Sequence, residues 1–255
     1  MHDSQGALKW PYKIKYDQQR EISADVVILG GGPAGAMAAI SAAKVGVSVV
    51  MLDKAHIKRS GGGSGVDHWL TTPTPPSKIT PEECVDWEVD SYDGYANALS
   101  RYIASREGWD TLLELEQMGA KIRDTDDEFV GAPYRDEATK LLFAYDYENR
   151  VTLRIWGTTF KPAMYKKCKE LGVIILNRMM VTSILTENGD IGGRVVGATA
   201  FNSRTGEFVV VKGNAVINCM GLHEANWMFS SELTGLPYFH PNIVADCWMT
   251  VPSSV

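Results

Sequence analysis

A glycine-rich loop between two apolar segments constrains the fold of this chain more than any other feature. Residues 25–29 (DVVIL) form a short apolar run, which is typical of a strand buried on both faces of a parallel sheet. An alanine-rich helix over residues 33–45 and a second strand over 47–52 complete a βαβ unit. Glycines with GxGxxG spacing join the first strand to the helix: Gly30, Gly32 and Gly35. The segment predicts a Rossmann-like nucleotide-binding fold.

Each glycine of this loop has a physical role in binding a dinucleotide. Gly30 makes the tight turn, Gly32 lets the backbone approach a pyrophosphate, and Gly35 lets the helix pack close to the strand. Pro33 and Ala34 open the helix, where free N–H groups and the positive end of the helix dipole stabilise phosphate. A glycine-rich turn that serves only the fold is the alternative interpretation.

An acidic residue ends the second strand. Asp53 stands where a carboxylate can accept hydrogen bonds from an adenosine ribose, whereas an arginine there would indicate NADP. The motif alone does not separate FAD from NAD, because both present an ADP group to it.

A second glycine-rich segment, residues 59–65 (RSGGGSG), follows Asp53. Its backbone donors could wrap a pyrophosphate, a ribityl chain or a flavin edge, although a flexible surface loop is the alternative. This segment favours FAD over NAD. The candidate cofactor-binding residues here are Lys54, Arg59, Ser60, Gly61, Gly62, Ser64 and Gly65.

The rest of the chain predicts helices and then a meander. Thr80 and Glu83 form a capping box that begins a helix, and further helices are expected over 97–118 and 159–171, with a strand over 173–176. Residues 181–218 switch to period-two apolar runs, which predict an antiparallel meander. The fold class is therefore α/β, a parallel sheet with a β-meander.

We expect a leader over residues 1–22 and an FAD-binding domain over 23–255, with 66–172 as a mostly helical insertion.

Composition excludes several classes of protein. The 255 residues carry a net charge of −6, which disfavours nucleic acid as a partner. The four cysteines are widely separated, which disfavours a zinc, iron–sulfur or disulfide framework and predicts reduced thiols in the cytoplasm. No secretory signal is visible, and no apolar run is long enough to span a membrane. No metal site is expected.

Two clusters of charge have simple interpretations. Asp124, Asp126, Asp127 and Glu128 lack the glycine and terminal glutamate of an EF-hand, so we expect a solvated surface turn within an irregular surface excursion over 119–150. The lysines of the helix over 159–171 predict an exposed face: Lys161, Lys166, Lys167 and Lys169.

Four segments together resemble one family of flavoproteins. These are ADVVILGGGPAG, the pair Asp53-Lys54, the RSGGGSG loop, and a late strand ending AVINCMG at residues 215–221. They are similar to the fumarate reductase and succinate dehydrogenase flavoproteins, and among these to the adenylylsulfate reductase alpha-subunit branch. The resemblance implies FAD on the Rossmann-like domain, closed over by a separate capping domain.

The resemblance also assigns individual residues. Where the fumarate reductase branch often has a histidine that attaches covalently to flavin, this chain has Gly61, which implies non-covalent FAD. The Val181 backbone would face the adenine. Cys219, Met220 and Gly221 replace the usual ATGG and would lie beside the adenosine and pyrophosphate.

The implied function is electron transfer between a small anionic substrate, such as a dicarboxylate or adenylylsulfate, and an iron–sulfur partner subunit. The family's catalytic residues lie in segments beyond Val255, so the catalytic residues here are unknown and the fold is expected to be incomplete. A fragment, a truncated gene product and half of a split enzyme are the open interpretations. Two other functions stay open: a non-catalytic FAD-binding subunit and an NAD-dependent dehydrogenase.

Overall fold

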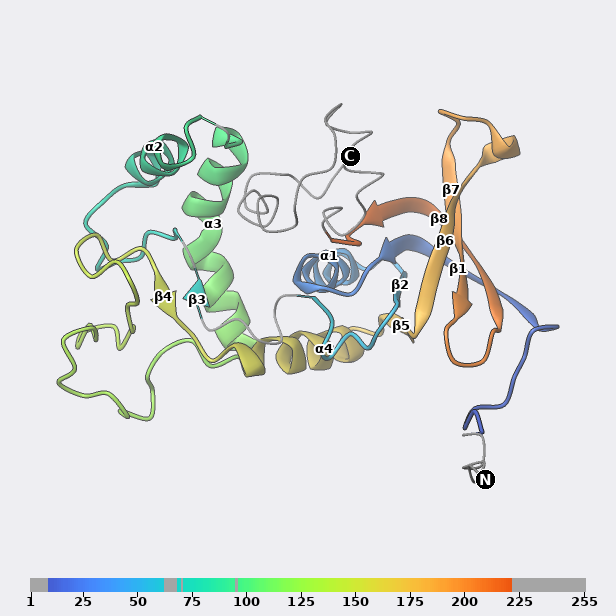
Figure 1. The fold of residues 1–255 in the computed structure, drawn as a ribbon, viewed down its shortest axis with the longest axis horizontal. Helices are drawn as coiled ribbons and strands as arrows, with labels where there is room; N and C mark the ends of the chain where they lie inside the picture. Colours follow the sequence, from blue (N-terminus) through green and yellow to red (C-terminus); the bar gives the residue numbers. More distant parts are fainter. Residues whose placement is uncertain (1–8, 62–67, 70, 95, 222–255) are drawn as a thin grey trace, which may run out of the picture.

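The computed structural model describes residues 9–61, 68–69, 71–94 and 96–221, and a six-stranded sheet forms its centre (Figure 1). The strand order is β5-β2-β1-β8-β7-β6. Neighbours from β5 to β8 run parallel, whereas β8, β7 and β6 are antiparallel. The predicted α/β fold with a parallel sheet and an antiparallel meander is confirmed. The strands are β1 (Gln19–Leu29), β2 (Val49–Asp53), β5 (Ile174–Asn177), β6 (Met179–Thr186), β7 (Val195–Asn202) and β8 (Phe208–Asn218).

Strand β1 begins earlier than the apolar run predicts. Its first half pairs with the first half of β8, from Gln19 opposite Phe208 to Ala24 opposite Gly213. Polar residues can form this part of the strand because its side chains are largely exposed. The predicted strand, residues 25–29, therefore covers only the less exposed end of β1, where β1 lies between β2 and β8.

Helices α1 (Pro33–Lys44) and α4 (Phe160–Glu170) pack against each other beside the sheet. Helices α2 (Pro81–Ser91) and α3 (Ala98–Gln117) lie apart from the central sheet, beside a small two-stranded antiparallel sheet of β3 (His68–Trp69) and β4 (Leu153–Arg154), as Figure 1 shows. The predicted capping box is confirmed: the Thr80 side chain accepts from the Glu83 N–H, and the Glu83 carboxylate accepts from the Thr80 N–H. Single turns of 3-10 helix occur at Gly157–Thr159 and Glu187–Gly189.

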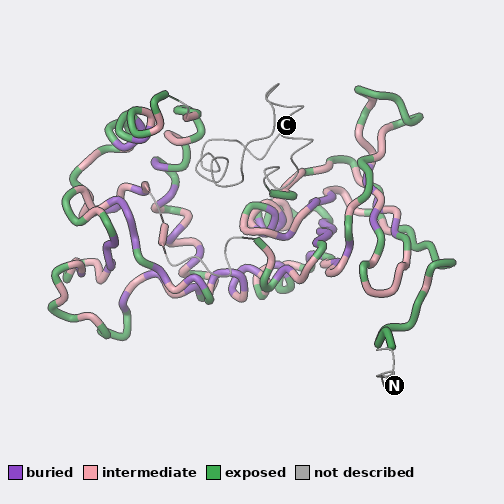
Figure 2. The backbone as a smooth tube through the Cα atoms, viewed as in Figure 1, coloured by how far each residue is buried: buried purple, intermediate pink, exposed green. Residues whose placement is uncertain are grey.

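The two faces of the central strands bury different hydrophobic cores. Ile28 and Met51 face α1 and α4, whereas Val27 and Leu29 face the meander. Buried stretches run through the central strands and α1 and continue into the helical part (Figure 2). Burial on both faces holds the ends of β1 and β2 rigidly, and these ends carry the glycine loop and Asp53.

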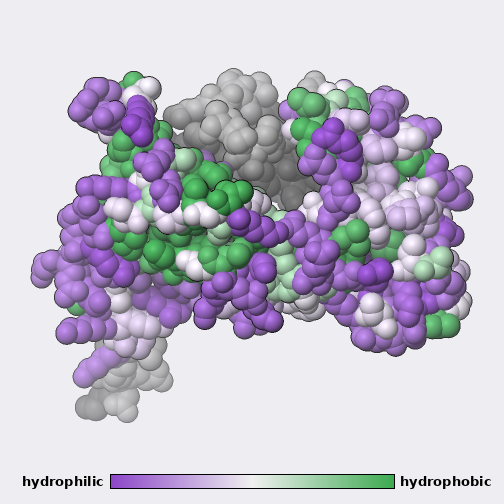
Figure 3. All heavy atoms as spheres, turned by 180° about the vertical axis from the view of Figure 1, so that it is seen from behind, coloured by the Kyte–Doolittle hydropathy of each residue, from purple (hydrophilic) through white to green (hydrophobic). Residues whose placement is uncertain are grey.

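The meander leaves hydrophobic residues exposed. From behind, such residues gather on the side of the molecule that the strands form (Figure 3). Phe201 pairs with both Met180 and Phe208 across neighbouring strands, so these three side chains form an apolar row that is more than one third exposed.

Candidate functional site

The glycine loop, Gly30–Gly35, takes its shape from close contacts that only glycine permits. Gly30 has φ +95°, and a Cβ there would lie 2.3 Å from the Cys219 carbonyl oxygen. A Cβ on Gly35 would lie 1.9 Å from the Gly30 carbonyl oxygen. A side chain at either position would collide with backbone atoms. Gly30 and Gly35 are therefore required for the backbone conformation of the loop, not for ligand access to it.

Gly32 has the opposite surroundings. A Cβ there would meet only the Gly61 Cα, at 3.8 Å, so Gly32 opens onto space. It is also the N-cap of α1, which has Pro33 in its first turn, no side-chain cap and no acidic residue there. The first-turn N–H groups are therefore left for an external anion, which suits a pyrophosphate.

Asp53 holds the glycine loop to the strand end. Its Oδ2 accepts a 2.7 Å hydrogen bond from the Gly31 N–H and a 2.5 Å bond from the Ser60 hydroxyl. Its Oδ1 accepts from the Ala55 N–H at 2.7 Å. Asp53 is only 3% exposed, and any ribose hydroxyl would have to share a carboxylate oxygen that a protein donor already uses.

Lys161 contacts the same loop from α4. The prediction that it lies on an exposed face is wrong: Lys161 is 0% exposed, and its Nζ donates to the Gly31 carbonyl at 2.6 Å. Lys166 and Lys169 are exposed as predicted, whereas Lys167 is half-buried. The signal was present, because Lys161 lies three and seven residues before the buried Met164 and Cys168, which places it on the buried face of the helix.

A cavity of about 490 Å³ lies between the glycine loop, the end of β2, the start of β6 and the segment after β8. This volume is in the range of roughly 300–1,000 Å³ that small-molecule sites occupy. The predicted residues that line it are Gly30, Gly32, Pro33, Ala34, Asp53, Lys54, Ser60, Gly61, Val181, Cys219, Met220 and Gly221. Segments that are distant in sequence therefore line one cavity, whose volume suits a small-molecule ligand.

Other predicted site residues have different positions. Gly35 lies behind the loop, and Arg59 is exposed and is not among the cavity residues. Gly62, Ser64 and Gly65 lie outside the described residues. The cavity also has lining residues that we did not predict, namely Leu52, Met179 and Met180. The two methionines could have been inferred from their position just before Val181.

Cys219 contributes backbone and an unreactive thiol to this cavity. Its N–H donates to the Leu29 carbonyl at 2.7 Å, which joins the end of β8 to the end of β1. Burial raises the pKa of its thiol, so the group stays protonated near neutral pH and is not an activated nucleophile.

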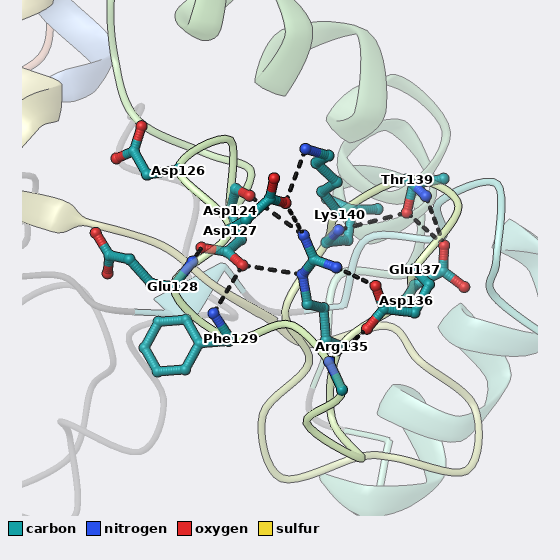
Figure 4. Close-up of polar contacts among 12 residues, drawn as sticks. Asp124, Asp126, Asp127, Glu128, Phe129, Arg135, Asp136, Glu137, Thr139 and Lys140 are labelled. Atoms are coloured by element: carbon teal, nitrogen blue, oxygen red, sulfur yellow. Dashed lines mark hydrogen bonds and ion pairs between the residues drawn. The ribbon is translucent and has the colours of Figure 1, made fainter.

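Residues 125–128 form the solvated surface turn that the sequence predicts, since all four are exposed, whereas Asp124 is a buried member of an ion-pair network. Asp124 is 0% exposed, and its Oδ2 lies 2.9 Å from the guanidinium of Arg135, which also pairs with Asp127 and Glu137. Figure 4 shows Arg135 among these carboxylates, with Asp126 directed away. Residues 119–150 form an irregular excursion as predicted, but part of it is not at the surface, because residues 141–144 are buried.

Neither a metal-ligand group nor a membrane-spanning helix occurs in the described part of the chain. Within it, no group of three or more histidine, cysteine or acidic side chains is arranged to hold a metal. None of its helices is both long and apolar enough to cross a bilayer.

The parallel sheet, the glycine loop at an uncapped helix N-terminus and the adjoining cavity define a dinucleotide-binding α/β protein. A family model described as an FAD binding domain matches residues 25–244. The chain belongs to this family of FAD-binding proteins, which confirms FAD as the cofactor. The search among curated proteins found no match.

Two reductases of known structure have a similar fold. Adenylylsulfate reductase from the hyperthermophilic Archaeoglobus fulgidus is 26% identical with a TM-score of 0.66, over 84% of this chain and 33% of that chain. E. coli quinol fumarate reductase is 18% identical with a TM-score of 0.64, over 79% of this chain and 33% of that chain, which shows the fold alone. The predicted resemblance to fumarate reductase, succinate dehydrogenase and adenylylsulfate reductase flavoproteins is confirmed. The chain spans about a third of the length of these relatives.

Proposed function

We propose that this chain holds FAD non-covalently and takes part in electron transfer between a small anionic substrate and a redox partner. The observation that carries the proposal is the cavity, in which the glycine loop, the end of β2, β6 and residues 219–221 meet. Bound FAD supplies the electron-transfer chemistry, while the protein supplies binding, orientation and electrostatics.

Different residues around the cavity would bind different parts of FAD. Gly32 and the first turn of α1 would hold the pyrophosphate through backbone N–H groups, where the helix dipole favours negative charge. Asp53 ends β2 and Lys54 follows it, and both would lie beside the adenosine ribose. The Val181 backbone would lie against the adenine, and Cys219, Met220 and Gly221 would close the cavity from the β8 side.

Gly61 is the basis for non-covalent binding. It lies next to the glycine loop, where a Cβ on Gly61 would stand only 2.9 Å from the Gly32 Cα, and it has no side chain that could form a bond to flavin. We expect denaturation of the purified holoprotein to release all FAD into the filtrate. Flavin that remains with the polypeptide in a denaturing gel would contradict this assignment.

Gly32→Val tests the cofactor site directly. The new side chain would enter the cavity and block the approach of the pyrophosphate, so we expect FAD binding to fall below detection while the circular dichroism of the apoprotein is unchanged. Gly32→Ala should give a smaller loss, because one methyl group projects less far. Wild-type protein that bound NADH but not FAD would overturn the proposal, as would a Val variant that keeps its flavin.

We also propose a substrate class and an electron-transfer partner. The similarity to adenylylsulfate reductase supports an anionic substrate such as adenylylsulfate or a dicarboxylate, and an iron–sulfur subunit as electron acceptor or donor. We assign the protein to the cytoplasm, where Cys84, Cys168 and Cys219, which are free thiols in the structure, would stay reduced.

The domain arrangement completes the proposal. We propose that residues 23–255 belong to the FAD-binding domain and that 66–172 form its mostly helical insertion. Helix α4 lies at the end of that insertion and returns to α1.

A further inference from the structure

Lys161 is a buried charge to which the proposed function assigns no role. It lies in the first turn of α4 and is 0% exposed, between Phe160 and the core residues Ala163 and Met164. Removing an ammonium group from water costs free energy. A methionine of similar size would fill the same space without that cost, so a lysine weakens the core unless its charge acts on a neighbour.

That neighbour is Gly31, the central residue of the glycine loop. The Lys161 Nζ donates to the Gly31 carbonyl at 2.6 Å, and the Gly31 N–H donates to Asp53 Oδ2 at 2.7 Å. A Cβ on Gly31 would lie 3.1 Å from Asp53 Oδ2 and 3.2 Å from a side-chain carbon of Ile57. Gly31 is therefore held at both of its polar groups, from α4 and from the end of β2, and is packed tightly between them.

The bond from Lys161 also fixes the direction of a second group. The Gly31 carbonyl and the Gly32 N–H belong to one planar trans peptide, so they point in opposite directions. Holding the carbonyl toward buried Lys161 directs the Gly32 N–H away from the ammonium. Gly32 lines the cavity.

We propose that Lys161 is a positioning residue for FAD, which orients the Gly31–Gly32 peptide for the pyrophosphate and places a positive charge behind it. This inference rests on the proposed function, because it requires FAD in the cavity. Lys161 need not touch the cofactor, since it acts through the peptide.

The charge of Lys161 is sensitive to pH. Burial lowers its pKa to about 8, against the opposing attraction of Asp53. Cys168, the other titratable group that acts on it, has a pKa raised by burial to about 11 and is uncharged in this range. The ammonium therefore predominates at pH 7, is about half lost at pH 8 and is almost wholly lost by pH 9.5. A neutral amine is a weaker donor to the carbonyl, so FAD affinity should fall as the pH rises through 8.

The test compares two variants of one helix. Lys161→Met removes the buried charge, and Lys166→Met is the matched control, because the Lys166 side chain is 75% exposed on the same helix. The dissociation constant of FAD is measured from flavin fluorescence between pH 6.5 and 9.5, with circular dichroism of each apoprotein. We expect Lys161→Met to weaken binding at pH 7 by about tenfold or more, and Lys166→Met to match the wild type.

The pH profile separates positioning from packing. Wild type and Lys166→Met should lose affinity about threefold or more between pH 7 and 9.5, whereas Lys161→Met should have a flat profile. Wild-type affinity for FAD in the Lys161→Met variant would overturn the inference, as would a flat profile in the wild type. If Lys161→Met does not fold, the wild-type profile alone decides. Failure of the proposed function would look different, because the wild type itself would then bind no FAD.

Discussion

Two loops of this molecule reach a defined shape by opposite means. The glycine loop, Gly30–Gly35, is shaped by absent side chains, since the carbonyl oxygens of Cys219 and Gly30 lie where Cβ atoms on Gly30 and Gly35 would stand. The charged loop, residues 124–140, is shaped by side chains, because the Arg135 guanidinium joins carboxylates from both of its ends. One loop presents backbone donors to a cavity, whereas the other uses its polar groups internally.

The difference shows which features make a loop available for binding. In the charged loop, Asp124 accepts hydrogen bonds from the Glu128 and Phe129 N–H groups in addition to its ion pair. Its acidic residues are therefore satisfied by the chain itself and need no cation. In the glycine loop, the first turn of α1 has no side-chain cap, so its donors remain for a ligand.

The largest expected effect is a loss of folding stability when a side chain is introduced into the glycine loop. Helix propensity predicts that Gly35→Ala stabilises α1 by about 1 kcal/mol, but the new Cβ would lie 1.9 Å from the Gly30 carbonyl oxygen. We expect a loss of about 4 kcal/mol in the free energy of unfolding, measured by urea denaturation. Gly32→Ala is the control and should change it by less than about 1 kcal/mol. Equal stability of both variants would contradict the role of backbone contact.

A smaller effect is expected from the charged loop. Asp124→Asn removes a buried charge opposite Arg135, and we expect unfolding free energy to fall by about 3 kcal/mol, because the guanidinium keeps its charge with one partner fewer. The same substitution at Asp126, whose side chain is 63% exposed, should cost less than about 0.5 kcal/mol. FAD affinity should stay at the wild-type value in both variants. A loss of FAD binding in Asp124→Asn would show that the two loops are coupled.

The smallest effect is a loosening of the charged loop in acid. Hydrogen bonding from Lys140, together with the charges of Lys140 and Arg135, lowers the pKa of Asp127 below its ordinary value of 3.8. Its contribution to stability is therefore complete above pH 3.8 and is lost as the pH falls through the lower, folded pKa. Amide exchange in residues 124–140 should accelerate at pH 3 relative to the glycine loop. Lys140→Met should move this acceleration to higher pH, and an unchanged profile would exclude Lys140 as the cause.

Sequence reasoning succeeded where a short local pattern determines the structure. The βαβ unit, the capping box at Thr80 and the positions of Gly30, Gly32 and Asp53 could all be predicted, because each depends on residues close together in the chain. The first half of β1 could not, since only its pairing with β8 makes it a strand. Lys161 and Asp124 were misinterpreted for a related reason: their partners lie 130 and 11 residues away, so charge alone suggested exposure.

The contact between Gly30 and Cys219 has a consequence for the order of folding. The turn that begins the glycine loop is closed by the segment that follows β8, nearly two hundred residues later in the chain. During synthesis, β1 can pair with β2 early, but its other edge stays open until β8 emerges. Contacts of such long sequence separation form slowly, and an open edge invites pairing with other chains. The glycine loop is thus translated well before the segment that gives it its final shape, so free FAD would bind the chain only after β8 has been made and paired.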